Sequence, residues 1–249
     1  MDEQGRIKTG IQGLDKALNG GIPTGNIVLI AGGAGTGKST LCLQFAINGA
    51  QLFGEKALYV STEQNKSELY RQANGFGWNL EELEKKQLLK VVYFDVTEGD
   101  SFLEKLSAIT AMYQPKRVVI DSLTTLTDSM LVSGVLEDKG FSMVQIAETV
   151  NPIPRTEKII SKTLLYHLFK ELKQTHVTTL LTTELPEDQH QLSADGTSEF
   201  IADGVILLSA MTVGDSSSRN LEVKKMRYTP IGGGIKSYSM SENGIIIDE

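Results

Sequence analysis

The sequence predicts an α/β fold in which a mainly parallel central sheet is flanked by helices. Two observations carry this prediction. Apolar segments of strand length alternate with segments of helical periodicity up to about residue 204, the pattern of a parallel sheet with helical crossovers. After Gly204, short strands with turns replace this rhythm, which predicts a C-terminal β meander that closes the sheet. Because no repeat, low-complexity segment or linker interrupts the chain, we expect residues 1–249 to form a single domain.

The individual elements follow from these patterns. Apolar, β-rich segments predict strands over Asn26–Ala31, Ala57–Ser61, Leu89–Phe94, Arg117–Asp121 and Val177–Thr182. Helical spacing predicts helices over Lys38–Phe53, Lys66–Asn74, Asn79–Lys86, Ser101–Tyr113 and about Lys158–Gln174. The expected meander consists of Val205–Ser209, Asn220–Tyr228, Ile235–Met240 and Gly244–Ile247.

Composition limits the classes of protein to be considered. The 249 residues are 40% hydrophobic and carry a net charge of −7, which is ordinary for a globular domain but unfavourable for binding nucleic acid. No apolar run approaches the roughly 20 residues of a membrane helix, and the polar start of the chain predicts no signal peptide. The single cysteine, Cys42, excludes an internal disulfide and favours the cytoplasm. We expect it to be a buried, unreactive residue of a helix.

The segment GGAGTGKST, residues 32–40, directly follows the first long apolar strand. Its spacing fits a phosphate-binding loop, in which glycines let backbone N–H groups point inward at phosphate oxygens. The helix after the loop adds its N-terminal dipole to the anion site. Lys38 is placed to reach the β- and γ-phosphates, and the Ser39 hydroxyl to bind Mg²⁺. The predicted nucleotide-binding residues are Gly33, Ala34, Gly35, Thr36, Gly37, Lys38, Ser39 and Thr40.

Two further strands end in carboxylates. The strand RVVID ends in Asp121, which we expect beside the loop as a second Mg²⁺ ligand, usually through water. The segment LYVSTEQ brings Glu63 to the carboxyl edge of the sheet, where ligands of open α/β sheets bind. A carboxylate at this position can orient a water molecule and accept its proton. Taken alone, however, Glu63 would be an ordinary acid at the end of a strand.

Seven segments occur together in a fixed order: TGIQGLDKALNGGIPTGN, GGAGTGKST, YVSTEQ, VVIDSL, LLTTE, IADGVILLS and KKMR. This ordered set resembles the KaiC-like family of RecA-like ATPases, common in archaea, over nearly the whole chain. The resemblance implies a RecA-like core, Mg·ATP hydrolysis, and ring homo-oligomers, often hexamers, with nucleotide at the subunit interfaces. Glu63 matches the family's catalytic glutamate. We expect Lys38 of the phosphate-binding loop to be a second catalytic residue. Many members have a second glutamate where this chain has Gln64, a departure that is expected to slow hydrolysis.

The segment NLEVKKMRY contains Lys225 and Arg227, which alternate along an expected strand and therefore share one face. Such a pair is usually a solvated surface. In the family, a K-x-R pair at this place reaches the γ-phosphate bound by the neighbouring subunit, like an arginine finger. The resemblance therefore implies that Lys225 and Arg227 act in trans, followed by the matching Thr229. The family's histidine two residues later is Ile231 here, a departure from the family pattern at this end of the strand.

Two more family features concern Glu184 and phosphorylation. Glu184 ends the segment LLTTE, where the family has an acid near the γ-phosphate that couples nucleotide state to later loops. A cap on the following turn is nearly as good an interpretation.

The family's clock kinase phosphorylates a Ser-Thr pair at positions that match Glu199 and Phe200, neither of which accepts phosphate. The sequence therefore argues against autokinase activity.

The interpretation as a ring-forming ATPase, with a protein partner as its target, has two rivals. A RadA-like recombinase paralogue would hold single-stranded DNA with loops near 128–158 and 184–203. The first of these loops carries a net charge of −2, and the second has six acidic residues and no Lys or Arg. Because DNA affinity depends on basic groups that neutralise phosphates, these loops argue against DNA binding. Pro152 and Pro154 predict that the first of these loops is free of helix around them. The second rival is a nucleotide-sensing module with little turnover, which Gln64 favours.

Overall fold

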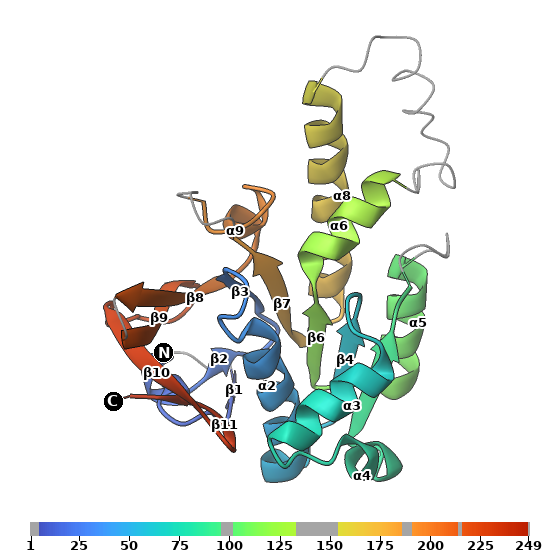
Figure 1. The fold of residues 1–249 in the computed structure, drawn as a ribbon. Coiled ribbons are helices and arrows are strands. Elements are labelled where there is room, and N and C mark those ends of the chain that lie inside the picture. The colour runs from blue at the N-terminus through green and yellow to red at the C-terminus, as the bar shows by residue number, and fades with distance from the viewer. Residues whose placement is uncertain (1–4, 96–101, 133–153, 186–190, 214–215, 249) are drawn as a thin grey trace.

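The computed structural model describes residues 5–95, 102–132, 154–185, 191–213 and 216–248. Its centre is a nine-stranded sheet in the order β11-β10-β9-β8-β3-β7-β6-β4-β5 (Figure 1). The parallel strands are β3 (Ile27–Gly32), β4 (Ala57–Ser61), β5 (Leu89–Tyr93), β6 (Arg117–Asp121), β7 (Thr178–Glu184) and β8 (Gly204–Val213). The predicted α/β fold with a mainly parallel sheet is confirmed.

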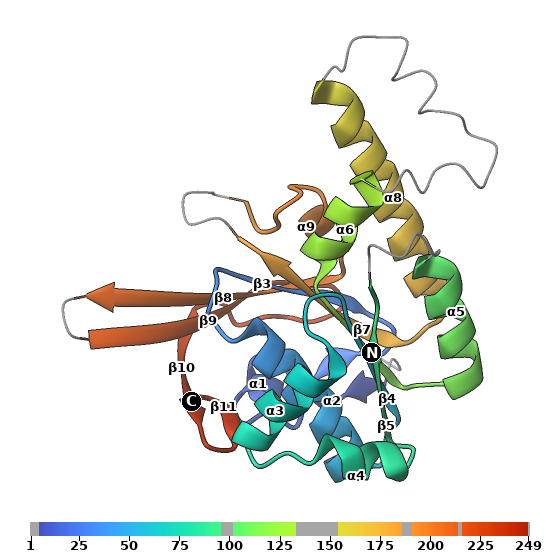
Figure 2. The same ribbon diagram turned by 45° about the vertical axis from the view of Figure 1, so that its right-hand side comes forward.

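The C-terminal part of the sheet is antiparallel, as the meander prediction required. β8 pairs with β9 (Ser216–Met226), β9 with β10 (Ile235–Ser241) and β10 with β11 (Gly244–Ile247). Figure 2 shows the β8–β9 ribbon projecting from the body of the molecule. The meander begins at β8, which pairs with β3, the strand that leads into the glycine-rich loop.

Helices cover both faces of the sheet (Figures 1 and 2). The helices on one face are α2 (Lys38–Phe53), α3 (Lys66–Gly75) and α4 (Leu80–Lys85); those on the other are α5 (Phe102–Tyr113), α6 (Leu123–Val132), α8 (Pro154–Gln174) and α9 (Ser198–Ile201). Each face has its own apolar cluster, because the inner strands are buried on both sides, as expected for parallel strands. Cys42 is fully buried in α2, as predicted, and burial raises the pKa of its thiol.

The structure corrects several predicted boundaries. The expectation of a helix-free region around Pro154 is wrong for the described part, because α8 begins at Pro154, and proline is favoured in the first turn of a helix. Asp128 lies in α6 rather than in a loop, while Pro152 lies outside the described residues. β9 ends at Met226, two residues earlier than expected, since Tyr228 has a φ of +62° that a strand cannot continue.

Three short elements near the start of the chain were not predicted. They are β1 (Arg6–Ile7), β2 (Ile22–Pro23) and α1 (Leu14–Ala17), and β1 and β2 form a separate antiparallel pair. Such short elements have no detectable periodicity. Within the described ranges, no helix combines the length and the apolar character needed to cross a membrane.

Candidate nucleotide site

The glycine-rich loop connects the carboxyl end of β3 to the start of α2, as the sequence predicted. Gly35 and Gly37 have φ values of +71° and +91°, a region that side chains disfavour. Lys38, the first residue of α2, is 8% exposed and donates a hydrogen bond from Nζ to the Gly33 oxygen at 3.0 Å. Thr36 Oγ1 donates to the same oxygen at 2.9 Å. The loop therefore curls around the Lys38 ammonium group.

A cavity of about 670 Å³ opens over this loop and brings most of the predicted residues together. Of the predicted site, the residues lining it are Ala34, Gly35, Gly37, Lys38, Ser39, Thr40, Glu63, Asp121 and Glu184. α3 contributes Arg71, a cation that the sequence analysis did not identify. The cavity has the size of a small-molecule site. It combines cationic side chains, carboxylates and loop backbone, which are the groups that bind a nucleoside triphosphate and its metal ion.

Asp121 lies at the end of β6 and is 4% exposed. Its Oδ2 accepts a hydrogen bond of 2.6 Å from the Tyr59 hydroxyl, and its Oδ1 accepts one of 2.6 Å from Thr182. Burial, together with the charge of Asp121, raises the pKa of Tyr59 well above its usual value. The carboxylate is therefore held in one orientation by donors from the two strands beside β6. Ser39 and Asp121 together supply the oxygen ligands that Mg²⁺ prefers, so these residues fit the ion.

Glu63 follows β4 and faces the same cavity. Its Oε1 accepts hydrogen bonds from the Ser122 hydroxyl and, at 2.9 Å, from Thr125 Oγ1. Ser122 is itself fixed, because its backbone N–H donates to Thr62 Oγ1 at 3.0 Å. Ser122 directly follows β6, and Thr125 lies in the first turn of α6. Sequence reasoning assigned neither hydroxyl group a role, and the one signal was the position of Ser122 next to Asp121.

Glu184 ends β7, in register with Gly32 of β3. Its Oε1 lies 3.7 Å from Lys38 Nζ, and its side chain is 53% exposed. The backbone N–H of Glu184 donates to Thr124 Oγ1 of α6 at 3.0 Å. Glu184 thus connects the loop lysine to the element that follows Asp121, and its role as a sensor remains a prediction.

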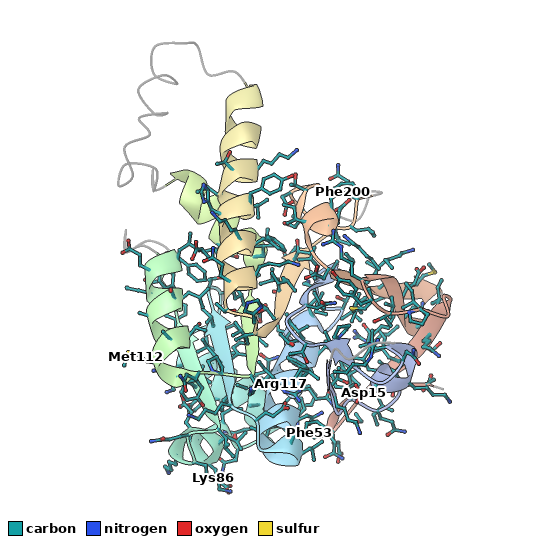
Figure 3. The ribbon with its side chains drawn as sticks, turned by 180° about the vertical axis from the view of Figure 1, so that it is seen from behind. Asp15, Phe53, Lys86, Met112, Arg117 and Phe200 are labelled. Carbon is teal, nitrogen blue, oxygen red and sulfur yellow. The ribbon has the colours of Figure 1, made fainter. Side chains whose placement is uncertain are left out.

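Lys225 and Arg227 lie outside this cavity. Lys225 Nζ donates to the Phe200 oxygen at 3.1 Å, and Arg227 Nη2 donates to the same oxygen at 3.4 Å. The two side chains therefore share one side, as predicted, although only Lys225 lies within β9. Burial, with the charge of Arg227, lowers the pKa of Lys225. Phe200 itself lies on α9, beside α8, and is 71% exposed (Figure 3).

The strand register shows which edge of the sheet carries this basic pair. Met226 pairs with Gly204 of β8, and Gly204 pairs with Val28 of β3. Val28 lies near the amino end of β3, whereas the phosphate loop follows the carboxyl end at Gly32. At about 3.3 Å per residue the two levels are on the order of 13 Å apart. Arg227, which follows Met226, therefore lies toward the edge of the sheet opposite its own phosphate loop.

A phosphate loop at the carboxyl edge of a mainly parallel sheet, extended by antiparallel C-terminal strands, defines this chain as a RecA-like ATPase fold. The model of the family "ATPase: KaiC" matches residues 7–136 and 143–249, so the chain belongs to the KaiC family of ATPases. The chain is similar to the circadian clock oscillator protein KaiC of Nostoc sp., with 29% identity over 97% of the chain, and to that of Synechococcus elongatus, with 27% over 97%. In both, the match covers 44% of the relative.

A solved structure extends this comparison. The KaiC-like protein PH0186 from Pyrococcus horikoshii OT3 matches with a TM-score of 0.80 and 32% identity. The match covers 99% of this chain and 100% of that one. The chain therefore spans less than half the length of the clock proteins but the full length of this archaeal relative. The resemblance that the ordered motifs indicated is confirmed.

Proposed function

We propose that this chain binds Mg·ATP in the cavity above the phosphate loop and hydrolyses it slowly. The observation that carries this proposal is that Lys38, Glu63 and Asp121 line one cavity of about 670 Å³. Lys38 would face the β- and γ-phosphates, and the backbone of the loop would hold the phosphate oxygens. Ser39 and Asp121 would hold Mg²⁺, which would neutralise charge on the phosphates.

Glu63 is the proposed general base. Its carboxylate would orient the attacking water and accept its proton, while Ser122 and Thr125 keep the side chain in place through bonds to Oε1. Gln64 lines the cavity next to Glu63, but its amide cannot accept a proton as a carboxylate does. We therefore propose low turnover rather than none, which distinguishes this function from a pure nucleotide sensor.

The catalytic site is proposed to be shared between subunits of a ring, a hexamer by family resemblance. Two features support this proposal. Lys225 and Arg227 lie toward the sheet edge opposite their own loop, so they are poorly placed to serve it. Both side chains are bound to α9 of their own chain, which gives them a defined direction before assembly. A protein partner is the proposed target of the ring.

The experiment that tests this function is light scattering with and without Mg·ATP, combined with a phosphate-release assay on the same sample. We expect a multimer several times the mass of one chain and slow, Mg-dependent release of phosphate. A chain that binds no nucleotide would contradict the proposal. Binding and assembly without any release of phosphate would instead support the sensing module.

A further inference from the structure

Two side chains of the C-terminal meander donate hydrogen bonds to the backbone of the phosphate loop. Arg219 on β9 donates from Nη1 to the Gly35 oxygen at 2.8 Å. Tyr238 on β10 donates from its hydroxyl group to the Thr36 oxygen. Both residues are remote from the loop in sequence, and the glycine–lysine–serine pattern gives no indication of them.

The meander packs closely against the loop at this point. Tyr238 is 4% exposed, and a Cβ atom added to Gly37 would clash with Met240 Cε. Burial raises the pKa of Tyr238, and the positive charge of the nearby Arg219 partly opposes this effect. Arg219 and Tyr238 are therefore neighbours, and they act on consecutive carbonyl groups.

The geometry of the peptide bond gives these contacts a consequence. In a trans peptide the C=O and N–H groups are coplanar and point in opposite directions. The Gly35 carbonyl shares its peptide with the N–H of Thr36, and the Thr36 carbonyl shares its peptide with the N–H of Gly37. The Thr36 N–H in fact points at the Gly33 oxygen, 3.4 Å away, the same oxygen that Lys38 Nζ contacts.

We infer that Arg219 and Tyr238 are positioning residues of the nucleotide site. By holding two loop carbonyls against the meander, they turn the N–H groups of Thr36 and Gly37 toward the side where Lys38 lies. The orientation of these two peptides is thus fixed before the nucleotide arrives, when the Thr36 N–H and Lys38 Nζ both donate to the Gly33 oxygen that a phosphate oxygen would replace. The meander thereby becomes part of the binding site. This inference rests on the proposed function, since it assumes that the loop binds a nucleotide.

Preorganisation predicts a specific defect in Tyr238→Phe, which removes one hydroxyl group and leaves the Thr36 carbonyl without this donor. Part of the free energy of nucleotide binding must then be used to order the loop, which weakens the observed affinity. We expect the Kd for Mg·ADP and the KM for ATP to rise about tenfold, with kcat nearly unchanged. Isothermal titration and steady-state phosphate release measure the two effects.

Tyr113→Phe is the matched control. The Tyr113 hydroxyl also donates to a backbone carbonyl, that of Gln87 at 2.9 Å, but far from the cavity. A general loss of stability would affect both variants, whereas lost positioning affects only Tyr238→Phe. Equal nucleotide affinity in the two variants and the wild type would overturn the inference.

Arg219 provides an independent test at a more exposed site, which decides the matter if Tyr238→Phe does not fold. Arg219→Met removes the donor to Gly35, while Arg219→Lys keeps a charged donor and should restore part of the affinity. Equal weakening by both variants, or none, would contradict a positioning role. If the wild-type chain binds no Mg·ADP, the proposed function fails together with this inference. If the wild type binds and none of the variants differs from it, the inference alone fails.

Discussion

Arg227 and Asp203 form an ion pair within the chain, with 3.0 Å between Nη1 and Oδ1. Asp203 is 1% exposed and also accepts hydrogen bonds from Lys173 Nζ, at 2.6 Å, and from the backbone N–H of Ile27, at 3.0 Å. The arginine proposed to act on a neighbouring subunit is thus oriented by a buried carboxylate of its own chain. Through these bonds the Asp203 carboxylate links the end of α8, the start of β3 and the residue that follows β9.

This arrangement predicts unequal costs for removing the two partners. Asp203→Ala deprives the buried Ile27 N–H of its acceptor and removes the partner of two cations, so we expect it to cost about 3 kcal/mol. Arg227→Ala should cost about 1 kcal/mol or less, because the Arg227 side chain is 44% exposed and Lys173 still pairs with Asp203. Urea unfolding of both variants measures the difference. An equal loss of unfolding free energy in the two variants would show that Asp203 does not hold α8, β3 and β9 together.

The roles of Lys38 and Glu63 are separable. Lys38→Ala removes the charge that faces the phosphates and should abolish ATP binding together with hydrolysis. Glu63→Gln keeps the shape and the hydrogen bonds of the side chain but cannot accept a proton, so ATP should still bind while phosphate release is lost. Titration with Mg·ATP and a phosphate-release assay distinguish the two variants. Hydrolysis at the wild-type rate in Glu63→Gln would remove Glu63 from the mechanism.

The buried Tyr59 hydroxyl predicts a pH effect. Its pKa is raised in the folded chain, mainly by burial, so the unfolded chain loses this proton first, near pH 10. The stabilisation linked to this group is complete below that pH and is lost as the pH rises toward the folded pKa. Just above pH 10, where an unburied tyrosine begins to ionise, the native tyrosinate absorbance should therefore be the same for the wild type and Tyr59→Phe. In urea the variant should show one tyrosinate fewer. A difference already present in the native state would show that Tyr59 ionises there and contradict this prediction.

Binding to single-stranded DNA should be weak at physiological salt and nearly independent of nucleotide. The net charge is −7, and the two loops that would hold a strand carry few basic residues. Fluorescence anisotropy with a labelled oligonucleotide, with and without ATP, measures this affinity. Submicromolar binding that ATP strengthens would instead favour the recombinase-paralogue function.

The parallel core and the loop were predictable because both depend on short-range patterns. The apolar strand before Gly32 and the spacing up to Lys38 specify a strand, a turn and a helix without knowledge of the rest of the chain. Asp121 and Glu63 were predictable for a similar reason, since the carboxyl ends of parallel strands meet at one edge of the sheet. These residues were found from their place at the ends of apolar segments.

The contacts that orient this site were not predictable from the sequence. Tyr59, Thr182 and Arg219 are ordinary strand residues by composition, and their partners depend on strand order and register, which local patterns do not specify. The early end of β9 depends on the positive φ of Tyr228, and the sequence contains no glycine there to indicate it. The structure therefore adds the supporting residues, whereas the sequence identifies the groups that they support.

We propose that one catalytic site is built from residues of two subunits. Mixing two inactive chains tests this arrangement. The first lacks Lys225 and Arg227 but keeps Glu63, and the second carries Glu63→Gln but keeps the basic pair. In a ring, random mixing makes about a quarter of the interfaces fully competent, because each interface takes the loop side from one chain and the basic pair from the next.

Phosphate release by the mixture is the deciding measurement, with subunit exchange confirmed by native mass spectrometry. Loss of an arginine finger typically lowers the rate on the order of 10³-fold or more, so competent interfaces in the mixture would stand clear of the background. A shared site predicts a modest recovery, of up to about a quarter of the wild-type rate, while each chain alone stays inactive. A mixture that exchanges subunits and remains as inactive as its components would contradict the shared site.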